Sequence, residues 1–383
     1  MKELAKSVVH SKKSVIRKLF ELVLTAKNAI SFGIGQPDFQ TPTNILEAIK
    51  KACDEKKTMY APATGIPQLR EAAAEKFRKE NGMDWVQAKN IMITNGGSQA
   101  LQFSYAVLLN PGDEVIINSP DFLSYYYLTE FNQAKIVEVK KNPDFSYDID
   151  GIKKAITSKT KFIILNSPNN PTGYVASRKE LKEIIEIAVD KDLYVVSDEV
   201  YERFIFDDKK HFTPASMKGL EERIITLNAM SKTFAAPGLR LGYVAASETI
   251  ITEMEKYAQY TSAGVSLPTQ YGALEALKSG NPEMEKVRTE YQAKRDYSYK
   301  RLVEIGFEVV KPTGAFYIMP KVTNFMNSGD EFSTQLMIDQ EVAVTPGSAF
   351  GSYSEQYNRI SYATSNQKLE EGFNRIENFV KKL

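Results

Sequence analysis

Residues 162–201 read FIILNSPNNPTGYVASRKELKEIIEIAVDKDLYVVSDEVY, and this stretch decides the fold. It begins with the apolar run Phe162–Leu165 and closes with a second one, Tyr194–Ser197. Between the two runs, apolar residues recur at helical spacing over Glu180–Lys191, which predicts an amphipathic helix. A strand, a helix and a second strand that is apolar on both faces are typical of a parallel sheet covered by helices.

The same alternation extends in both directions along the chain. Five further β-branched runs, each bounded by Gly, Pro, Asn or Asp, predict strands at Ile91–Thr94, Val115–Asn118, Ile136–Val139, Ile224–Leu227 and Tyr243–Ala246. We therefore predict an α/β fold in which a large domain, residues 46–284, holds a mostly parallel seven-stranded sheet.

The pattern changes after residue 280. A long charged helical pattern is followed by short strands and a final helix, at Glu283–Ile305, Phe307–Val310, Ala315–Met319, Arg359–Tyr362 and Gln367–Lys382. Near the start, a predicted helix at Ser14–Lys27 and a Gly/Pro-rich loop at Gly33–Pro42 stand outside the β-α alternation. We assign residues 1–45 and 285–383 together to a smaller α+β domain.

Composition excludes several classes of function. Lys and Arg number 49 against 48 Asp and Glu, so no global field attracts nucleic acid or a membrane surface. Cys53 is the only cysteine, which fits a reducing compartment, and we expect it to be partly buried. We expect no signal peptide, because Met1–Glu3 does not lead into a long apolar run, and hence a cytoplasmic protein. His10 and His211 lie among charged residues, so we expect both at the surface, neither catalytic, and no metal site.

In open α/β sheets, ligands bind at the carboxyl ends of the strands, and reactive residues follow the predicted strands here. Lys232 follows one strand, and Arg240 lies eight residues further on. A lysine at a strand end is usually a solvated charge. A desolvated lysine near another cation, however, has a lowered pKa and becomes a nucleophile that can form a Schiff base. Arg240 would supply that positive charge, and its guanidinium could donate two parallel hydrogen bonds to a phosphate.

Two further strand ends carry candidate residues. Asp198 either caps a following helix or pairs with a protonated heterocyclic nitrogen, and Tyr201 follows it. Gly96-Gly97-Ser98 leads from a strand into a helix. That turn is either a tight connection or a phosphate site made of free backbone N–H groups at a helix N-terminus.

Six patches occur in order along the chain: Gly35–Pro42, Tyr60–Gly65, Asn166–Gly173, Ser197–Tyr201, Ser231–Phe234 with Arg240–Tyr243, and Arg359–Thr364. Together they resemble the class I (class I/II) family of aminotransferases that depend on pyridoxal 5′-phosphate (PLP), over essentially the whole chain. Two other stretches, Ile16–Phe20 and Gly347–Gly351, are similar to its aspartate and aromatic aminotransferase branch.

The resemblance implies the PLP-dependent transferase fold and a role for each matching residue. Lys232 would form the Schiff base with PLP and shuttle a proton. Asp198 would hold the ring nitrogen protonated, and Tyr201 would act with Asn170 on the phenolate oxygen. The same resemblance implies that Phe122 stacks on the ring, that Gly97, Ser98 and Arg240 bind the phosphate, and that Gly35, Asn170 and Arg359 bind the substrate carboxylate.

Two implied contacts are less direct. Relatives carry a hydroxyl residue three positions before the lysine; here that residue is Ala229, and Ser231 is the nearest hydroxyl, which we count with the cofactor-binding residues. Tyr60 would reach the phosphate in the neighbouring subunit, which implies a homodimer with shared active sites.

The expected reaction moves an amino group from an L-amino acid, aspartate or aromatic, to a 2-oxoacid, with 2-oxoglutarate as the expected acceptor and a ping-pong mechanism. A ring of aromatic residues favours an aromatic donor: Phe122, Tyr125, Tyr126 and Tyr260. A PLP-dependent lyase or synthase on the same fold, such as a carbon–sulfur lyase or an aminocyclopropane-carboxylate synthase, remains an alternative, because the same residues serve those reactions. A non-catalytic sensor is disfavoured because the reactive residues are intact and no DNA-binding segment is attached.

Overall fold

The computed structural model describes residue 4, residues 6–9 and residues 28–383. Three features singled out in the sequence therefore lie outside the described residues: His10, Ile16–Phe20 and the predicted helix Ser14–Lys27. In the part of the chain that the structure describes, no helix is both long enough and apolar enough to cross a membrane.

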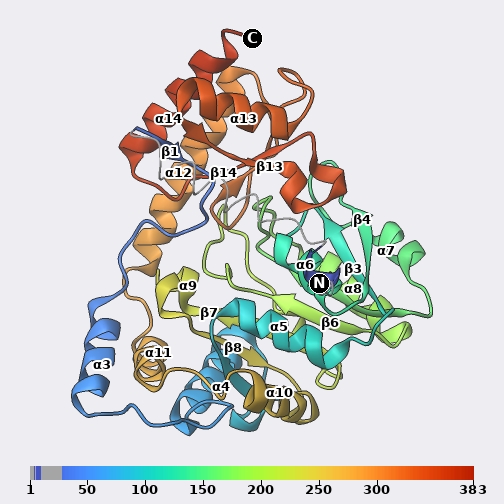
Figure 1. Cartoon of the computed structure of the whole chain (residues 1–383), viewed down its shortest axis with the longest axis vertical. Helices are drawn as coiled ribbons and strands as arrows, with labels where there is room; N and C mark the ends of the chain where they lie inside the picture. The colour runs from blue at the N-terminus through green and yellow to red at the C-terminus, as the bar shows by residue number, and fades with distance from the viewer. Residues whose placement is uncertain (1–3, 5, 10–27) are drawn as a thin grey trace.

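A seven-stranded sheet runs through the larger lobe in the order β2-β8-β7-β6-β5-β3-β4 (Figure 1). Strand β8 is antiparallel to both of its neighbours, and every other neighbouring pair is parallel. The predicted α/β fold with a mostly parallel seven-stranded sheet is confirmed. All seven predicted runs overlap its strands, which are β2 (Ile91–Thr94), β3 (Glu114–Ser119), β4 (Lys135–Lys140), β5 (Thr160–Asn166), β6 (Tyr194–Asp198), β7 (Ile224–Ala229) and β8 (Gly242–Ala245).

The strands are apolar on both faces because each face packs against its own layer of helices. Ile91 and Ile93 join one core and Met92 joins the other, as the alternation of side chains along a strand requires. The first core includes residues of α3 (Thr43–Asp54), α4 (Pro67–Asn81), α7 (Ile149–Ala155), α8 (Arg178–Asp190) and α11 (Leu267–Ser279). The second includes residues of α5 (Gly97–Leu108), α6 (Leu123–Phe131) and α10 (Glu248–Thr261).

Helix α8 shows why one predicted element begins where it does. The Ser177 hydroxyl accepts a hydrogen bond from the Glu180 N–H at 3.2 Å, and the Glu180 carboxylate accepts one from the Ser177 N–H at 2.8 Å. This capping box satisfies two backbone donors that the first turn of a helix leaves free. The helix therefore begins at Arg178, two residues before the predicted start, and buries Leu181, Ile184 and Ile185 against the sheet.

The C-terminal elements gather into a second, smaller lobe, drawn in orange and red in Figure 1. Strand β1 joins this lobe from the other end of the chain, because Ile30 pairs with Val342 in a parallel ladder. The lobe's elements are β1 (Ile30–Ser31), α12 (Met284–Ile305), β9 (Glu308–Val309), β10 (Tyr317–Ile318), β11 (Pro320–Lys321), α13 (Gly329–Gln340), β12 (Val342–Ala343), β13 (Thr345–Pro346), β14 (Asn358–Ser361) and α14 (Asn366–Val380). The boundaries given above, 1–45 with 285–383 and 46–284, stay our proposal for the domains.

Part of the site is carried by short helical elements, of which the described part of the chain holds seven. They are α1 (Lys6–Val9), α9 (Met230–Thr233), η1 (Ala88–Asn90), η2 (Pro214–Ser216), η3 (Pro237–Leu239), η4 (Gly347–Phe350) and η5 (Ser352–Ser354). The core of the small lobe also takes in Tyr201 and Phe204, which follow β6 in the chain. The segment after β6 is thus held between the two lobes.

The loop that begins at Gly33 is fixed to α12. The Asp38 carboxylate accepts hydrogen bonds from the Tyr291 hydroxyl at 2.6 Å and from the Lys294 ammonium at 2.5 Å. A few residues before this contact, Gly35 lines the cavity described below. The contact thus helps to hold that part of the loop against the smaller lobe.

The prediction that Cys53 is partly buried is wrong. Cys53 is exposed on α3, whose buried residues are Ile45 and Ala52. Helix α3 packs against α11, and residue 53 lies about 100° around the helix from residue 52, so its side chain turns away from that contact.

Candidate active site

Lys232 lies in the single turn α9, directly after β7, and faces a cavity of ≈ 230 Å³. Its ammonium donates a hydrogen bond to the Gly35 carbonyl at 2.6 Å. Loss of solvent around the ammonium, followed by the Arg359 guanidinium, lowers the pKa of Lys232 to about 8, although Asp198 opposes the shift. A lysine with a pKa this low is partly neutral near pH 7 to 8, so it can act as a nucleophile or a base.

Asp198 ends β6 and is buried in the wall of the same cavity. Its carboxylate accepts hydrogen bonds from the Tyr125 hydroxyl at 2.8 Å and the Val200 N–H at 3.3 Å. Burial raises the pKa of Asp198 to about 6, and these two hydrogen bonds limit the rise. Residues 200–203 form a turn and no helix follows, so Asp198 is not a helix cap.

Two buried tyrosines lie side by side next to Lys232. The Tyr201 and Tyr317 hydroxyl oxygens are 2.8 Å apart, and the Lys232 ammonium lies 5.5 Å from the Tyr201 ring centre. Burial raises the pKa of both phenols, so both are protonated and able to donate. Gly35 packs so closely here that a Cβ atom on it would lie 2.0 Å from the Tyr317 hydroxyl oxygen, and only glycine fits.

Arg359 lies on β14 with 2% of its surface exposed. Its guanidinium donates to the Asn170 side-chain oxygen at 2.9 Å and to the Gly33 carbonyl at 2.6 Å, while its Nε atom is buried without a partner. Among the residues that the structure describes, no carboxylate lies within ion-pair distance of it. A buried cation without a counter-charge is costly, so the site favours an anionic ligand here.

Besides Arg359, the cavity has another cationic region, at the N-terminus of α5. Gly97 and Ser98 open that helix and line the cavity, as does Arg240, which follows η3. Gly96 has φ 80°, and a Cβ atom there would lie 2.7 Å from an Arg240 guanidinium nitrogen, so the turn requires glycine. Free backbone N–H groups, the helix dipole and a guanidinium together suit a phosphate group.

The structure brings nearly all of the sequence-predicted residues to this one cavity. Those that line it are Gly35, Gly97, Ser98, Phe122, Asn170, Asp198, Tyr201, Ser231, Lys232, Arg240 and Arg359. Tyr60 does not line it and is 92% exposed. Tyr317 also lines the cavity but was not predicted as a site residue. The only sequence feature that pointed to it was its position in the predicted strand Ala315–Met319.

The predicted aromatic ring is only partly present. Phe122 and Tyr125 line the cavity, but the Tyr126 hydroxyl instead donates to the Phe350 carbonyl at 2.9 Å. The prediction that Tyr260 belongs to the ring is wrong for this chain's cavity. Tyr260 is 91% exposed, because α10 turns Met254 and Ala258 towards the core and leaves this position outside.

Comparison with known proteins shows to which family this chain is related. The family model described as aminotransferase class I and II matches residues 27–376. The chain belongs to this family. The aminotransferase is 46% identical to the aspartate aminotransferase of Pyrococcus abyssi, over 95% of each chain. It is 44% identical to the aromatic-amino-acid aminotransferase 2 of Thermococcus litoralis, over 96% of each.

Solved structures agree with this assignment. An aspartate aminotransferase from Thermus thermophilus with maleate superposes with a TM-score of 0.94 at 34% identity, covering 99% of this aminotransferase and 100% of that chain. An aromatic aminotransferase from Pyrococcus horikoshii superposes with a TM-score of 0.89 at 44% identity. The match covers 96% of this aminotransferase and 99% of that chain. The predicted family and enzyme class are confirmed.

The aminotransferase uses PLP, as its family does, and the cavity fits that cofactor. PLP offers an aldehyde, a pyridine nitrogen and a phosphate. The cavity offers a lysine of lowered pKa, a buried carboxylate and a cationic helix N-terminus. The partnerless Nε atom of Arg359 is a further buried donor in the same cavity.

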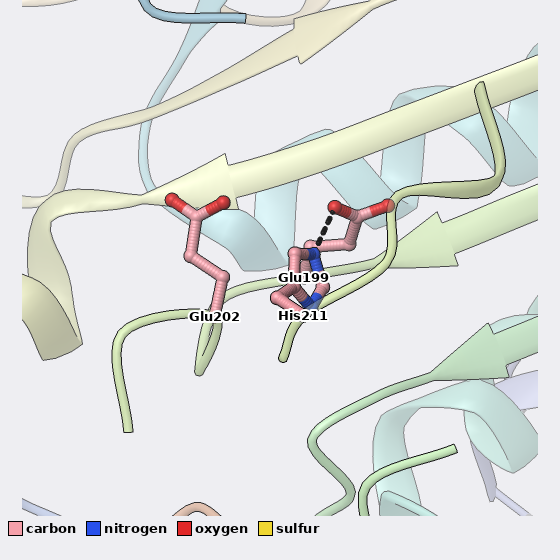
Figure 2. A group of neighbouring side chains, drawn as sticks. All are labelled: Glu199, Glu202 and His211. Atoms are coloured by element: carbon pink, nitrogen blue, oxygen red, sulfur yellow. Dashed lines mark hydrogen bonds and ion pairs between the residues drawn. The ribbon is translucent and has the colours of Figure 1, made fainter. Parts of the chain in front are cut away.

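The prediction that His211 is a surface residue is wrong. Its side chain is only 15% exposed, and its Nε2 atom lies 2.6 Å from the Glu199 carboxylate (Figure 2). The charged neighbours in the sequence suggested exposure, but the residue that pairs with His211 follows β6, directly after Asp198.

Proposed function

We propose that the enzyme transfers the amino group of an L-amino acid, aspartate or aromatic, to a 2-oxoacid by a ping-pong mechanism, with 2-oxoglutarate as acceptor. One observation supports this most. A single cavity joins Lys232, whose pKa is about 8, the buried carboxylate Asp198, and the buried cation Arg359, which has no counter-charge among the described residues. The cytoplasm is the proposed location.

The lining of the cavity supports a proposed place for each group of the cofactor. Lys232 holds PLP covalently, and Asp198 keeps the ring nitrogen protonated. Phe122 covers a face of the ring. The Tyr201 hydroxyl and the Asn170 side-chain N–H₂ donate to the phenolate oxygen, since Asn170 already uses its oxygen to accept from Arg359. The phosphate lies with Gly97, Ser98, Ser231 and Arg240.

When bound, the cofactor supplies an electron-withdrawing ring that stabilises the carbanion left by the departing α-proton. The protein's own part is proton transfer and orientation. Lys232 can take and return the α-proton, because a pKa of about 8 lies near the working pH. Arg359 fixes the substrate carboxylate, which sets the α-bond that lies perpendicular to the ring.

The lining of the cavity favours an aromatic donor over aspartate. Its cations are Lys232, Arg240 and Arg359, and each already has a proposed role. No fourth cation lines the cavity within the described part of the chain, so none remains there for a side-chain carboxylate. Apolar and aromatic residues, Leu101, Phe122 and Val200, form much of the rest.

Two other proposals concern assembly and chemistry. We propose a homodimer in which Tyr60, exposed in the single chain, reaches the phosphate of the neighbouring subunit. The lyase or synthase alternative is set aside, because the relatives compared above carry aminotransferase names.

A half-reaction screen tests the proposal. The purified holoenzyme is mixed with each common L-amino acid in turn, and the cofactor absorbance is followed. Phenylalanine and tyrosine should convert the cofactor to its amino form faster than aspartate does, and 2-oxoglutarate should restore the starting spectrum. Lys232→Ala should still bind the cofactor noncovalently but should show no conversion. Release of ammonia with return of the starting spectrum, when no 2-oxoacid has been added, would contradict transamination.

A further inference from the structure

A buried charged cluster lies directly behind Asp198. Glu199 is the next residue and is 1% exposed. Its side chain turns away from the cavity, because successive residues of an extended segment project to opposite faces. Its carboxylate accepts hydrogen bonds from the hydroxyls of Ser197 at 2.8 Å and Thr213 at 2.6 Å, and it contacts His211 at 2.6 Å.

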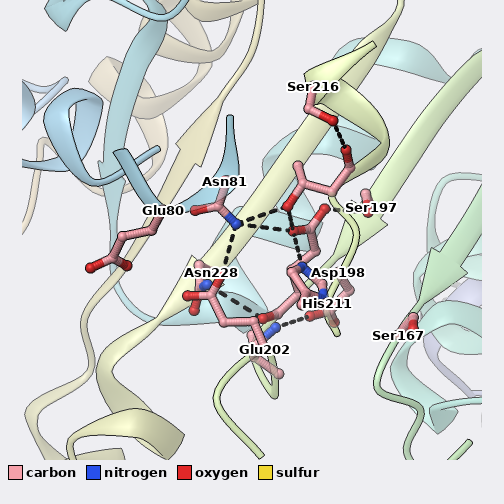
Figure 3. Close-up of polar contacts among 12 residues, drawn as sticks. Glu80, Asn81, Ser167, Ser197, Asp198, Glu202, His211, Ser216 and Asn228 are labelled. Carbon is pink, nitrogen blue, oxygen red and sulfur yellow. Dashed lines mark hydrogen bonds and ion pairs between the residues drawn. The ribbon is translucent and has the colours of Figure 1, made fainter. Parts of the chain in front are cut away.

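The other half of the cluster comes from α4 and the turn after β6 (Figure 3). Glu202 forms a buried ion pair with Lys76 and accepts a hydrogen bond from Asn81 at 2.8 Å. Asn81 also donates to the Thr213 hydroxyl at 2.8 Å, which joins the two halves. Beyond them, Glu80 pairs with Arg203 at 2.5 Å.

The cluster balances its charge only when His211 is protonated. The groups that face His211 are Glu199, Glu202 and Lys76, and Lys76 can neutralise one carboxylate. Burial disfavours the imidazolium, but the two carboxylates outweigh it and raise the pKa of His211 above its ordinary value. A neutral His211 would leave Glu199 as an unpaired buried carboxylate, which is costly. The Lys76 ammonium pairs with Glu202, so this carboxylate already has a counter-charge from the protein.

The cluster acts on Asp198 through Glu199. A like charge nearby disfavours ionisation, and Glu199 is among the groups that raise the pKa of Asp198. The backbone between them is also fixed: the Asn228 side chain donates to the Glu199 carbonyl at 3.3 Å, and the Asn166 side chain donates to the Asp198 carbonyl at 3.0 Å. Asp198 is therefore held in place with a carboxylate directly behind it.

We propose that His211 is a positioning residue for the aminotransferase reaction: its imidazolium pairs with Glu199 and cancels the negative charge behind Asp198, so that Asp198 remains ionised and can hold a cofactor ring nitrogen protonated. The inference rests on the role of Asp198 in the proposed function. It assigns a role in the reaction to a side chain that does not touch the cavity.

Charge cancellation makes opposite predictions for the two partners of one ion pair. His211→Gln keeps a hydrogen-bond donor but removes the positive charge, so Asp198 should become harder to ionise. Glu199→Gln removes the negative charge, so Asp198 should ionise at least as easily as in the wild type. The double variant should behave like Glu199→Gln. A pair that only stabilises the fold would instead change Asp198 in the same way, or not at all, in both single variants.

The experiment measures PLP binding to each apoenzyme by absorbance between pH 5 and 9, with thermal unfolding recorded in parallel. On the acid side of the binding curve, PLP binding weakens as the pH falls, and we call this part of the curve the acid limb. In His211→Gln the acid limb should lie about one pH unit higher than in the wild type. In Glu199→Gln and in the double variant it should stay or move down. Equal acid limbs in all four proteins, or an upward shift in both single variants, would overturn the proposal.

Two controls keep the outcome interpretable. If His211→Gln does not fold, Glu199→Gln and the double variant still decide, because an upward shift in either contradicts charge cancellation. Asp198→Asn tests the underlying assumption. If that variant keeps the wild-type acid limb, then the role of Asp198 in the proposed function fails, whatever His211 does.

Discussion

Removing one hydroxyl, by Tyr125→Phe, should change how readily the enzyme holds its cofactor in mild acid. The Tyr125 hydroxyl donates to Asp198 at 2.8 Å, and both residues are buried. A hydrogen bond to a charged group contributes about 1.5–3 kcal/mol. One pKa unit corresponds to about 1.36 kcal/mol, so the pKa of Asp198 should rise by about 1 to 2 units. It starts at about 6 in the wild type.

The assay is PLP binding to the apoenzyme as a function of pH. Asp198 can pair with a protonated ring nitrogen only when ionised, so wild-type binding should weaken as the pH falls through about 6. In Tyr125→Phe the same weakening should begin about 1 to 2 pH units higher. Tyr126→Phe is the matched control, because that hydroxyl donates to the Phe350 carbonyl instead. An unchanged acid limb, or an equal shift in the control, would refute the reasoning.

Three further predictions concern the rest of the site. Arg359→Leu should raise KM for every amino donor alike, because the lost contact is to the shared carboxylate; a selective effect in steady-state assays would contradict that role. The rate at which PLP loads the apoenzyme, followed by stopped-flow absorbance, should rise with pH through about 8, since only neutral Lys232 attacks an aldehyde; a flat profile would argue against the lowered pKa. Mixing Tyr60→Ala with Lys232→Ala subunits should give more activity than the two parents summed, because one site of each mixed dimer has both residues; no gain would argue against shared sites.

Stability should also depend on pH through His211. Its pKa is raised in the folded protein, so the ion pair with Glu199 contributes fully below about 6.5, the ordinary value of histidine. The contribution is lost as the pH rises through the raised pKa. The melting temperature of the wild type should therefore fall more than that of the Glu199→Gln/His211→Gln double variant between pH 6.5 and pH 9. Parallel curves for the two proteins would contradict a charged pair.

The sheet was predictable because its signal is local. Runs such as Phe162–Leu165 are apolar on both faces, and short turns bound them, so each strand is visible without knowledge of its neighbours. The strand-end residues then follow from topology, because parallel strands bring their carboxyl ends to one edge. Lys232 and Asp198 are placed in one cavity by that rule.

The remaining features depend on contacts distant in sequence. His211 follows two lysines and looks exposed, yet its partner Glu199 lies at the end of another strand. Tyr317 carries no sequence signal of its hydrogen bond to Tyr201, from which 116 positions separate it. Periodicity and composition cannot report such pairs, since each depends on how the two lobes and the loops after the strands pack together.

The single reversed strand, β8, has a consequence for how the site is built. Ala229 at the end of β7 pairs with Gly242 at the start of β8, so residues 230–241 leave the sheet and return at the same edge. Both Lys232 and Arg240 lie within that excursion. The group that bonds the cofactor and a group that neutralises its phosphate thus belong to one continuous hairpin, with a separation set by a few local torsions. An insertion in a helical crossover elsewhere would leave their spacing intact, whereas one added residue between them would alter it directly.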